Sequence, residues 1–144
     1  MSDMAFQTMK SDRKIYVVVR TDLPPYAIVP QACHAVAELG RNGLIRHDEE
    51  HPIIVVLGVP SLDELRRVFV AARKLGIRCR YWVESDLGNL ETALATEAIP
   101  ATMREPFKKL SLLCPATKVD PRHSEPCGLS KDAGHHFSNE VALV

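Results

Sequence analysis

Two mostly apolar, β-branched runs occupy residues 15–20 and 53–57 of the chain. Continuous runs of this length predict strands that are buried on both faces of a parallel sheet. Residues 77–83 alternate between apolar and polar side chains, which predicts a strand near a sheet edge. The run at residues 92–96 predicts a fourth strand, close enough in sequence to the third to turn back towards it.

The first helix is predicted from Pro30, a residue suited to the first helical turn. Apolar residues at positions 32, 33, 36, 37 and 39 form the stripe that such a helix would bury. Gly40 and Gly43 follow as candidate stops. The polar residues 47–51 then link this helix to the second strand.

Two further segments carry the signature of a helix start. Ser61-Leu62-Asp63-Glu64 fits a capping box, and apolar positions 62, 65, 69, 72 and 75 predict a helix that Gly76 closes. Residues 102–105 fit a second capping box, which predicts a short helix through Phe107 and Leu110, although Pro106 disfavours it.

The order of these elements predicts an α/β fold, a three-layer α/β/α sandwich with a small four-stranded mixed sheet. We expect the domain to span residues 13–114. Residues 1–12 are polar and non-periodic, and residues 115–144 are rich in Pro, Ser, Gly, Lys and His, so both are expected to be flexible. Ligands in such folds bind beyond the carboxyl ends of the parallel strands.

Composition narrows the class of protein only modestly. The 144 residues suffice for one domain with a hydrophobic core, and the 18 basic and 18 acidic side chains give no overall sign of a nucleic-acid partner. No stretch approaches the roughly 18 apolar residues that cross a bilayer, so we expect a soluble intracellular protein with no membrane partner. The four cysteines are widely spaced without a Cys-x-x-Cys pair, which argues against a zinc site.

Cys33 and His34 are adjacent in the first predicted helix. Neighbouring helical residues point about 100° apart, which argues against a catalytic dyad, and we interpret Cys33 as a buried core thiol. His34 lies three residues after Gln31 and four before Glu38, so all three fit one polar face, with Glu38 able to orient the imidazole ring. A solvated polar face explains this spacing as well as a catalytic histidine does.

Residues 15–23, followed by Gln31-Ala32-Cys33-His34-Ala35, resemble the opening of the archaeal and eukaryotic (type II) peptidyl-tRNA hydrolases. That family begins with a strand, an Arg-x-Asp-Leu turn and a Gln-x-x-His-Ala helix. The later segments agree, and the divergent eukaryotic peptidyl-tRNA hydrolase domain-containing proteins are similar in Gln-Ala-Cys-His-Ala and in Trp82-Val83-Glu84. The resemblance covers about residues 14–113.

The resemblance implies a cytoplasmic hydrolase that cleaves the ester between a peptide, or an N-blocked aminoacyl group, and tRNA, without a metal or organic cofactor. It also implies an antiparallel fourth strand and, commonly, a homodimer. By residue match, the implied site consists of Asp22 in the turn, Gln31 and His34 on the helix, Glu84 where the family has an aspartate, Asp86 as its nearby substitute, and Thr92. Solvated turn carboxylates and an ordinary strand threonine explain Glu84, Asp86 and Thr92 equally well.

A departure from the family pattern affects the activity. The family lysine four residues before the glutamine is replaced by Ala27, which removes a phosphate contact and an electrostatic stabiliser of the transition state. Two alternatives to a peptidyl-tRNA hydrolase therefore stay open. One is a catalytically impaired RNA-binding or protein-interaction module of the same fold, and the other is a hydrolase of another small ester.

If hydrolysis is retained, His34 would activate water, or Glu84 would if Trp82 raises its pKa. Thr92 and backbone amides near the start of the helix would hold the carbonyl oxygen. Trp82 itself is expected to be partly buried packing or a stacking platform for a base. A phosphate-binding rim would consist of Arg20, Arg41 and Arg46.

Overall fold

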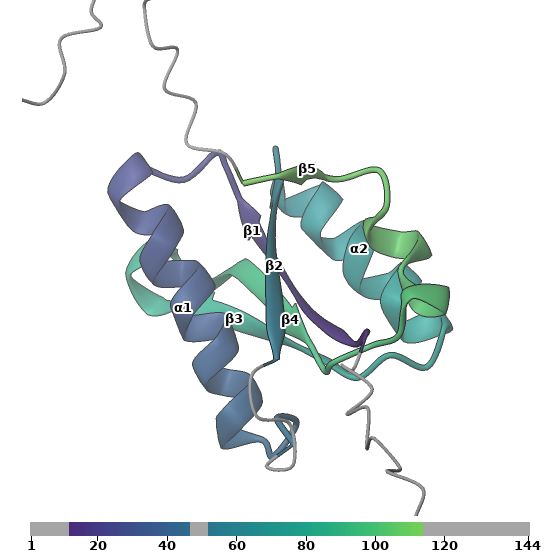
Figure 1. The fold of residues 1–144 in the computed structure, drawn as a ribbon. Coiled ribbons are helices and arrows are strands. Elements are labelled where there is room, and N and C mark those ends of the chain that lie inside the picture. Colours follow the sequence, from purple (N-terminus) through teal and green to yellow (C-terminus); the bar gives the residue numbers. More distant parts are fainter. Residues whose placement is uncertain (1–11, 47–51, 114–144) are drawn as a thin grey trace, which may run out of the picture. The chain divides into compact units, whose positions relative to one another are not determined.

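The computed structural model describes residues 12–46 and 52–113, and these build one mixed sheet of five strands. The strands are β1 (Lys14–Arg20), β2 (Ile53–Val59), β3 (Cys79–Glu84), β4 (Leu90–Thr96) and β5 (Ser111–Leu112), and their order in the sheet is β3-β4-β1-β2-β5 (Figure 1). The segments expected to be flexible, residues 1–12 and 115–144, lie outside the described residues except for Asp12.

The sheet combines parallel and antiparallel pairs. β1 pairs in parallel with β2, whereas β4 runs antiparallel to its neighbours β1 and β3. The antiparallel fourth strand and the edge position of the third are thereby confirmed. The expected count of four strands is wrong, because β5 adds an antiparallel partner to β2. A two-residue strand is too short to show any periodic pattern in the sequence.

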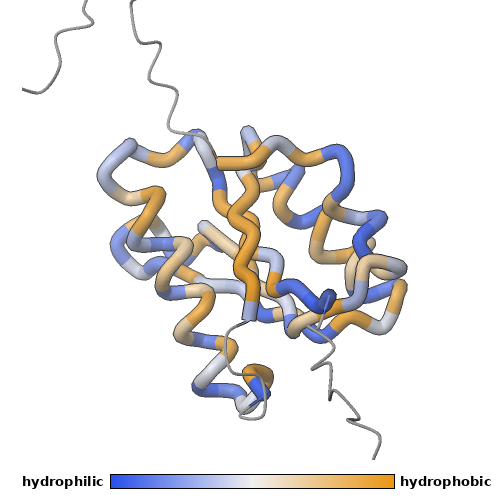
Figure 2. The backbone as a smooth tube through the Cα atoms, in the orientation of Figure 1, coloured by the Kyte–Doolittle hydropathy of each residue, from blue (hydrophilic) through white to orange (hydrophobic). Residues whose placement is uncertain are grey.

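Two helices, α1 (Pro25–Arg41) and α2 (Leu62–Lys74), cover opposite faces of the sheet (Figure 1). Val17 and Val19 point to the core beneath α1, and Val18 points to the core beneath α2. All three valines are fully buried, and burial of one such side chain stabilises a fold by about 1.5–3 kcal/mol. Figure 2 shows the hydrophobic colour along β2 between the helices.

α1 begins at Pro25, five residues before the predicted start at Pro30. Pro24 and Pro25 form the N-terminal boundary, where a missing backbone N–H costs nothing. Pro30 lies inside the helix on an exposed face. The side chains that α1 buries are Ala27, Gln31, Ala32, Ala35 and Leu39.

These buried positions of α1 differ from the predicted burial of Cys33 and Gln31. The buried stripe recurs mainly every four residues from position 27, and it therefore passes through Gln31 rather than through position 33. Cys33 is exposed, so the interpretation as a buried core thiol is wrong. Gln31, expected on the polar face with His34, is only 5% exposed.

Of the two helix starts predicted at residues 61–64 and 102–105, the structure contains only the first. The Ser61 hydroxyl accepts a hydrogen bond from the backbone N–H of Glu64 at 3.2 Å, which confirms the N-cap of α2. The predicted helix from residue 102 to 110 is wrong. Two 3₁₀ turns, η2 (Ala101–Met103) and η3 (Glu105–Phe107), occupy the segment instead, consistent with a Pro106 ring that cannot donate to a continuous helix.

The second turn still anchors the segment. The Phe107 ring stacks on Tyr16 of β1 with centroids 4.7 Å apart, and Phe107 is buried in the core beneath α2. None of the helices in the part of the chain that the structure describes is long and apolar enough to cross a membrane.

Candidate active site

A chain of side-chain hydrogen bonds joins β4, α1 and β3 at the end of the sheet where β1 and β3 finish. The Thr92 hydroxyl donates to Gln31 Oε1 at 2.6 Å, and Gln31 Nε2 donates to Glu84 Oε2 at 3.0 Å. The indole N–H of Trp82 donates to the same Glu84 oxygen at 3.3 Å. Three of the residues implied by the resemblance are therefore connected, because Gln31 bonds to both Thr92 and Glu84.

A β-bulge places Thr92 in this chain. Trp82 pairs with Ala93, but the next residue of β3, Val83, pairs with Glu91, so Thr92 is the extra residue of β4. The Thr92 hydroxyl and the Ala93 side chain both lie on the α1 side of the sheet, whereas the Glu91 carboxylate bonds to Arg66 of α2. Strict alternation would have directed Thr92 away from α1, and bulges re-aim side chains in this way.

His34 of α1 lies beside the same group. Its imidazole ring stacks on the Trp82 ring, with centroids 4.6 Å apart and planes inclined by 18°. His34 is exposed, so water can reach it. Glu38, expected to orient this ring, instead accepts a hydrogen bond from Asn42 and pairs with Arg41. The group that orients the imidazole is thus the indole of β3.

The electrostatics of Glu84 differ from the expectation that Trp82 would raise its pKa. The hydrogen bonds from Gln31 and Trp82 lower the pKa of Glu84, and a backbone hydrogen bond at Asp86 and the nearby His34 act in the same direction. Donors to a carboxylate stabilise its charged form. Glu84 is therefore an ionised acceptor at neutral pH, and the sequence-based hypothesis that it is a neutral-pH base is wrong.

Asp86 lies in the 3₁₀ turn η1 (Ser85–Leu87), and its side chain is exposed. Its contribution to Glu84 comes from the backbone. Gly88 follows with φ of 75°, a left-handed conformation that glycine adopts without strain, and the chain then returns as β4. This short turn places Glu84 and Thr92 on neighbouring strands of the same site.

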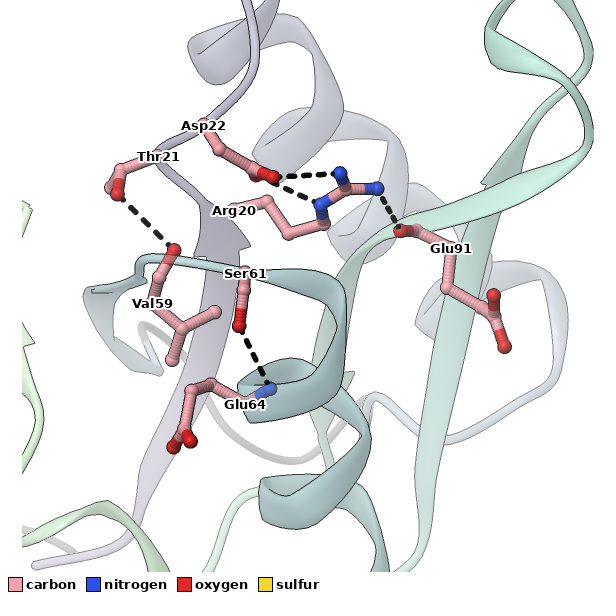
Figure 3. A network of polar contacts seen from close by, with 7 residues as sticks. All are labelled: Arg20, Thr21, Asp22, Val59, Ser61, Glu64 and Glu91. Atoms are coloured by element: carbon pink, nitrogen blue, oxygen red, sulfur yellow. Dashed lines mark hydrogen bonds and ion pairs between the residues drawn. The ribbon is translucent and has the colours of Figure 1, made fainter.

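Asp22 belongs to an adjacent ion pair (Figure 3). Arg20 donates two hydrogen bonds of 2.9 Å to the Asp22 carboxylate and one of 3.2 Å to the backbone carbonyl of Glu91. The hydrogen bond and charge of Arg20 lower the pKa of Asp22. Because Glu91 precedes Thr92, this pair connects the end of β1 to the start of β4 beside the bulge.

The other proposed rim residues lie at the far end of α1. Arg41 follows Gln31 by ten residues, which corresponds to about 15 Å along a helix. Its side chain is 81% exposed and approaches Glu38 at 3.9 Å. Arg46 is also exposed. The Arg20 side chain is only 13% exposed, so its guanidinium serves mainly the internal pair with Asp22.

Two further expectations depend on where α1 begins. Amides near a helix start at Pro30 were candidate donors for a carbonyl oxygen, but α1 starts at Pro25, so the amides next to His34 lie in the helix interior. The expectation of donors there is wrong.

Ala27, at the position of the family lysine, is 8% exposed and packed in the core beneath α1. A lysine there would have to leave this packing.

The sequence predicts Trp82 as packing, as a stacking platform or as a neighbour of Glu84, but it does not predict the contact of Trp82 with His34. The contacts of Trp82 with both His34 and Glu84 depend on pairing of α1 with β3, and the only sequence signal was the Trp-Val-Glu match itself. Within residues 12–46 and 52–113, no three His, Cys, Asp or Glu side chains form a group that could hold a metal ion.

Comparison with known proteins identifies the fold and the family to which this site belongs. The family model described as peptidyl-tRNA hydrolase PTH2 matches residues 13–113. A solved structure of a protein of unknown function from Agrobacterium tumefaciens strain C58 is similar with a TM-score of 0.55 and 16% sequence identity, over 72% of this chain and 98% of that one. That likeness concerns the fold alone. No curated protein matches the sequence.

Proposed function

Because the chain belongs to the peptidyl-tRNA hydrolase PTH2 family, we propose that the site around His34 and Glu84 cleaves the ester bond between a peptide, or an N-blocked aminoacyl group, and tRNA. The observation that carries the proposal is the accessible His34 imidazole beside an ionised carboxylate. Gln31 and Trp82 donate hydrogen bonds to that carboxylate, and the Thr92 hydroxyl donates to the amide oxygen of Gln31.

In the proposed mechanism His34 is the general base. Its neutral imidazole takes a proton from a water molecule, whose oxygen attacks the carbonyl carbon of the ester. The tetrahedral intermediate then breaks the bond to the ribose oxygen, and the imidazolium returns the proton to that leaving oxygen. The negative charge of Glu84 stabilises the imidazolium while it exists.

Gln31 and Thr92 have positioning roles in this mechanism. Thr92 is fully buried and its hydroxyl proton is directed at Gln31, so it acts through Gln31 rather than on the substrate. Gln31 in turn directs its amide N–H at Glu84. Asp22 and Asp86 support the site indirectly. Asp22 forms an ion pair with Arg20, and the backbone of Asp86 forms a hydrogen bond with Glu84.

We propose that tRNA phosphates bind at the exposed residues Arg41, about 15 Å along α1 from Gln31, and Arg46, which follows the helix. Affinity should then fall steeply with salt. A translation substrate also supports a cytoplasmic location. We propose a homodimer as well, supported by the apolar outer surface of α1, where Tyr26 is 81% and Val29 62% exposed.

A second candidate function has an observation in its favour. Residues 24–37 carry no Asp, Glu, Lys or Arg, so the surface of α1 beside His34 offers no cation to a polyanion. This favours either a binding module that lacks the chemistry or a hydrolase of a small uncharged ester. Both share the fold and differ from the first proposal in what they cleave.

Single-turnover hydrolysis of N-acetyl-aminoacyl-tRNA tests the proposal, with tRNA binding measured in parallel at several salt concentrations. We expect His34→Gln to lower the rate at least about tenfold, equivalent to about 1.4 kcal/mol of transition-state stabilisation. Cys33→Ser is the matched control, because Cys33 is adjacent, exposed and outside the hydrogen-bonded group.

The outcomes separate the candidates. Binding without cleavage by the wild type would make the protein an RNA-binding module. Cleavage of a small ester but not of the tRNA ester would favour the other hydrolase. Equal rates for wild type and His34→Gln would refute the assigned base.

A further inference from the structure

Trp82 contacts both His34, the proposed base, and Glu84, the carboxylate beside it. Its ring stacks on His34 of α1 at 4.6 Å, and its indole N–H donates to Glu84 Oε2 at 3.3 Å. Trp82 is half-buried and packs against the core beneath α1. An indole is rigid beyond its two side-chain torsions, so these two contacts fix the imidazole and the carboxylate relative to each other.

We propose that Trp82 is a positioning residue of the hydrolytic reaction, which holds His34 by stacking and Glu84 by hydrogen bonding in the arrangement that proton transfer needs. The inference rests on the proposed function. The stacked ring has a second effect, because the face of an indole attracts a cation. It therefore stabilises the imidazolium that forms when His34 takes a proton from water.

The groups near His34 show why Trp82 is assigned the positioning role. From β3, Glu84 faces the imidazole and Trp82 covers it. From α1 itself, Glu38 is engaged by Asn42 and Arg41. In η1, the Asp86 side chain is exposed and its backbone supports Glu84. Of these groups, Glu84 acts on the imidazole by its charge and Trp82 by its stacked ring.

Two substitutions separate the two contacts. Trp82→Phe keeps a stacked ring but removes the N–H donor, whereas Trp82→Leu removes both. Tyr81→Leu is the matched control, because Tyr81 stacks on Phe69 of α2 with centroids 4.1 Å apart, on the opposite face of the same strand. It removes an aromatic stack of the same kind without touching the site.

The first readout is the pH dependence of kcat/KM for an N-acetyl-aminoacyl-tRNA. We expect Trp82→Leu to lower kcat/KM at least about tenfold and to move the acid limb of the profile to lower pH, because the imidazolium loses the indole face. Trp82→Phe should retain the wild-type acid limb with a smaller loss of rate. Equal losses and unmoved acid limbs in Trp82→Leu and Tyr81→Leu would overturn the inference.

The second readout needs no activity. Trp82 is the only tryptophan in the chain, so the intrinsic indole fluorescence comes from this site. Because the imidazole of His34 stacks on the indole, we expect a step in this fluorescence when the imidazole gains its charge. The step should persist in Tyr81→Leu and disappear in His34→Gln.

The two readouts keep the two proposals apart. A wild-type protein without hydrolytic activity, but with a His34-dependent fluorescence step, would refute the proposed function while supporting the contact between Trp82 and His34. An active wild type without that step would overturn the positioning role instead.

Discussion

The substitution Thr92→Val tests whether the hydrogen-bonded chain stabilises the fold. Valine keeps the shape of threonine but removes the hydroxyl, which donates to Gln31 Oε1 at 2.6 Å. Thr92 is 0% and Gln31 is 5% exposed, so the amide oxygen would be left in the interior without this donor. Loss of one partner from a buried pair costs about 1–3 kcal/mol.

Urea and thermal unfolding would measure this cost. For an ordered domain of about 100 residues, each 1 kcal/mol lowers Tm by roughly 4–8 °C, so we expect a clear shift. Thr21→Val is the matched control, because Thr21 is an exposed residue whose hydroxyl donates to the Val59 carbonyl at 3.2 Å. It should change stability by no more than about 0.5 kcal/mol.

A double-mutant cycle with Gln31→Met would isolate the pair. Methionine has the length of glutamine without its amide, so the double mutant removes donor and acceptor together. We expect the Thr92→Val cost to shrink by about 1 kcal/mol in the Gln31→Met background. If Thr92→Val costs no more than Thr21→Val, the bulge does not direct the hydroxyl at Gln31 and the reasoning fails.

Three other predictions concern charge, packing and accessibility. Hydrogen bonds, first from Gln31, lower the pKa of Glu84 below its ordinary 4.5, so its stabilising charge is present above that pH and is lost as pH falls further. In urea titrations, the difference in unfolding free energy between wild type and Glu84→Gln should therefore narrow from pH 7 to about pH 3. A constant difference would contradict this reasoning. Gly58→Ala would place a Cβ 2.8 Å from the methyl group of Thr21, the residue after β1, so it should lower the free energy of unfolding by about 1–3 kcal/mol. An unchanged Tm would argue against this close approach. In the native protein, peptide mapping after alkylation should find Cys33 modified and Cys79 protected, because Cys33 is exposed while burial raises the pKa of Cys79 to about 11; equal labelling of both would refute it.

The elements with strong local signals were predictable from the sequence. The β-branched runs at Ile15 and Ile53 both form strands, and the first is buried as predicted. The prediction of burial on both faces is wrong for the start of the second, because Ile53 and Ile54 are exposed. Ser61 predicts the start of α2, because an N-cap side chain accepts a hydrogen bond from a backbone N–H within the same turn. α1 was placed less well, because Pro30 favours a first turn by local rules while packing of Ala27 extends the helix beyond it.

The site was predictable as a set of residues but not as a geometry. The family resemblance brought Gln31, His34, Glu84 and Thr92 together, and three of them are linked by hydrogen bonds. The bond from Gln31 to Glu84 spans 53 positions, so no local pattern contains it. The pKa direction of Glu84 was mistaken for the same reason, since its donors become neighbours only when α1 packs on the sheet.

The central place of β1 has a consequence for how the chain folds during synthesis. Of the five described strands, β1 is the first to leave the ribosome, yet its partners β2 and β4 follow later, and Tyr16 bonds to Thr96 across 80 positions. Non-local pairing of this kind slows folding, because a long loop must close before any contact forms. A nascent chain that ends before Leu90 leaves one edge of β1 unpaired and its apolar side chains only partly covered. The domain therefore becomes protected from aggregation late in its own translation, when β4 is inserted between β1 and β3.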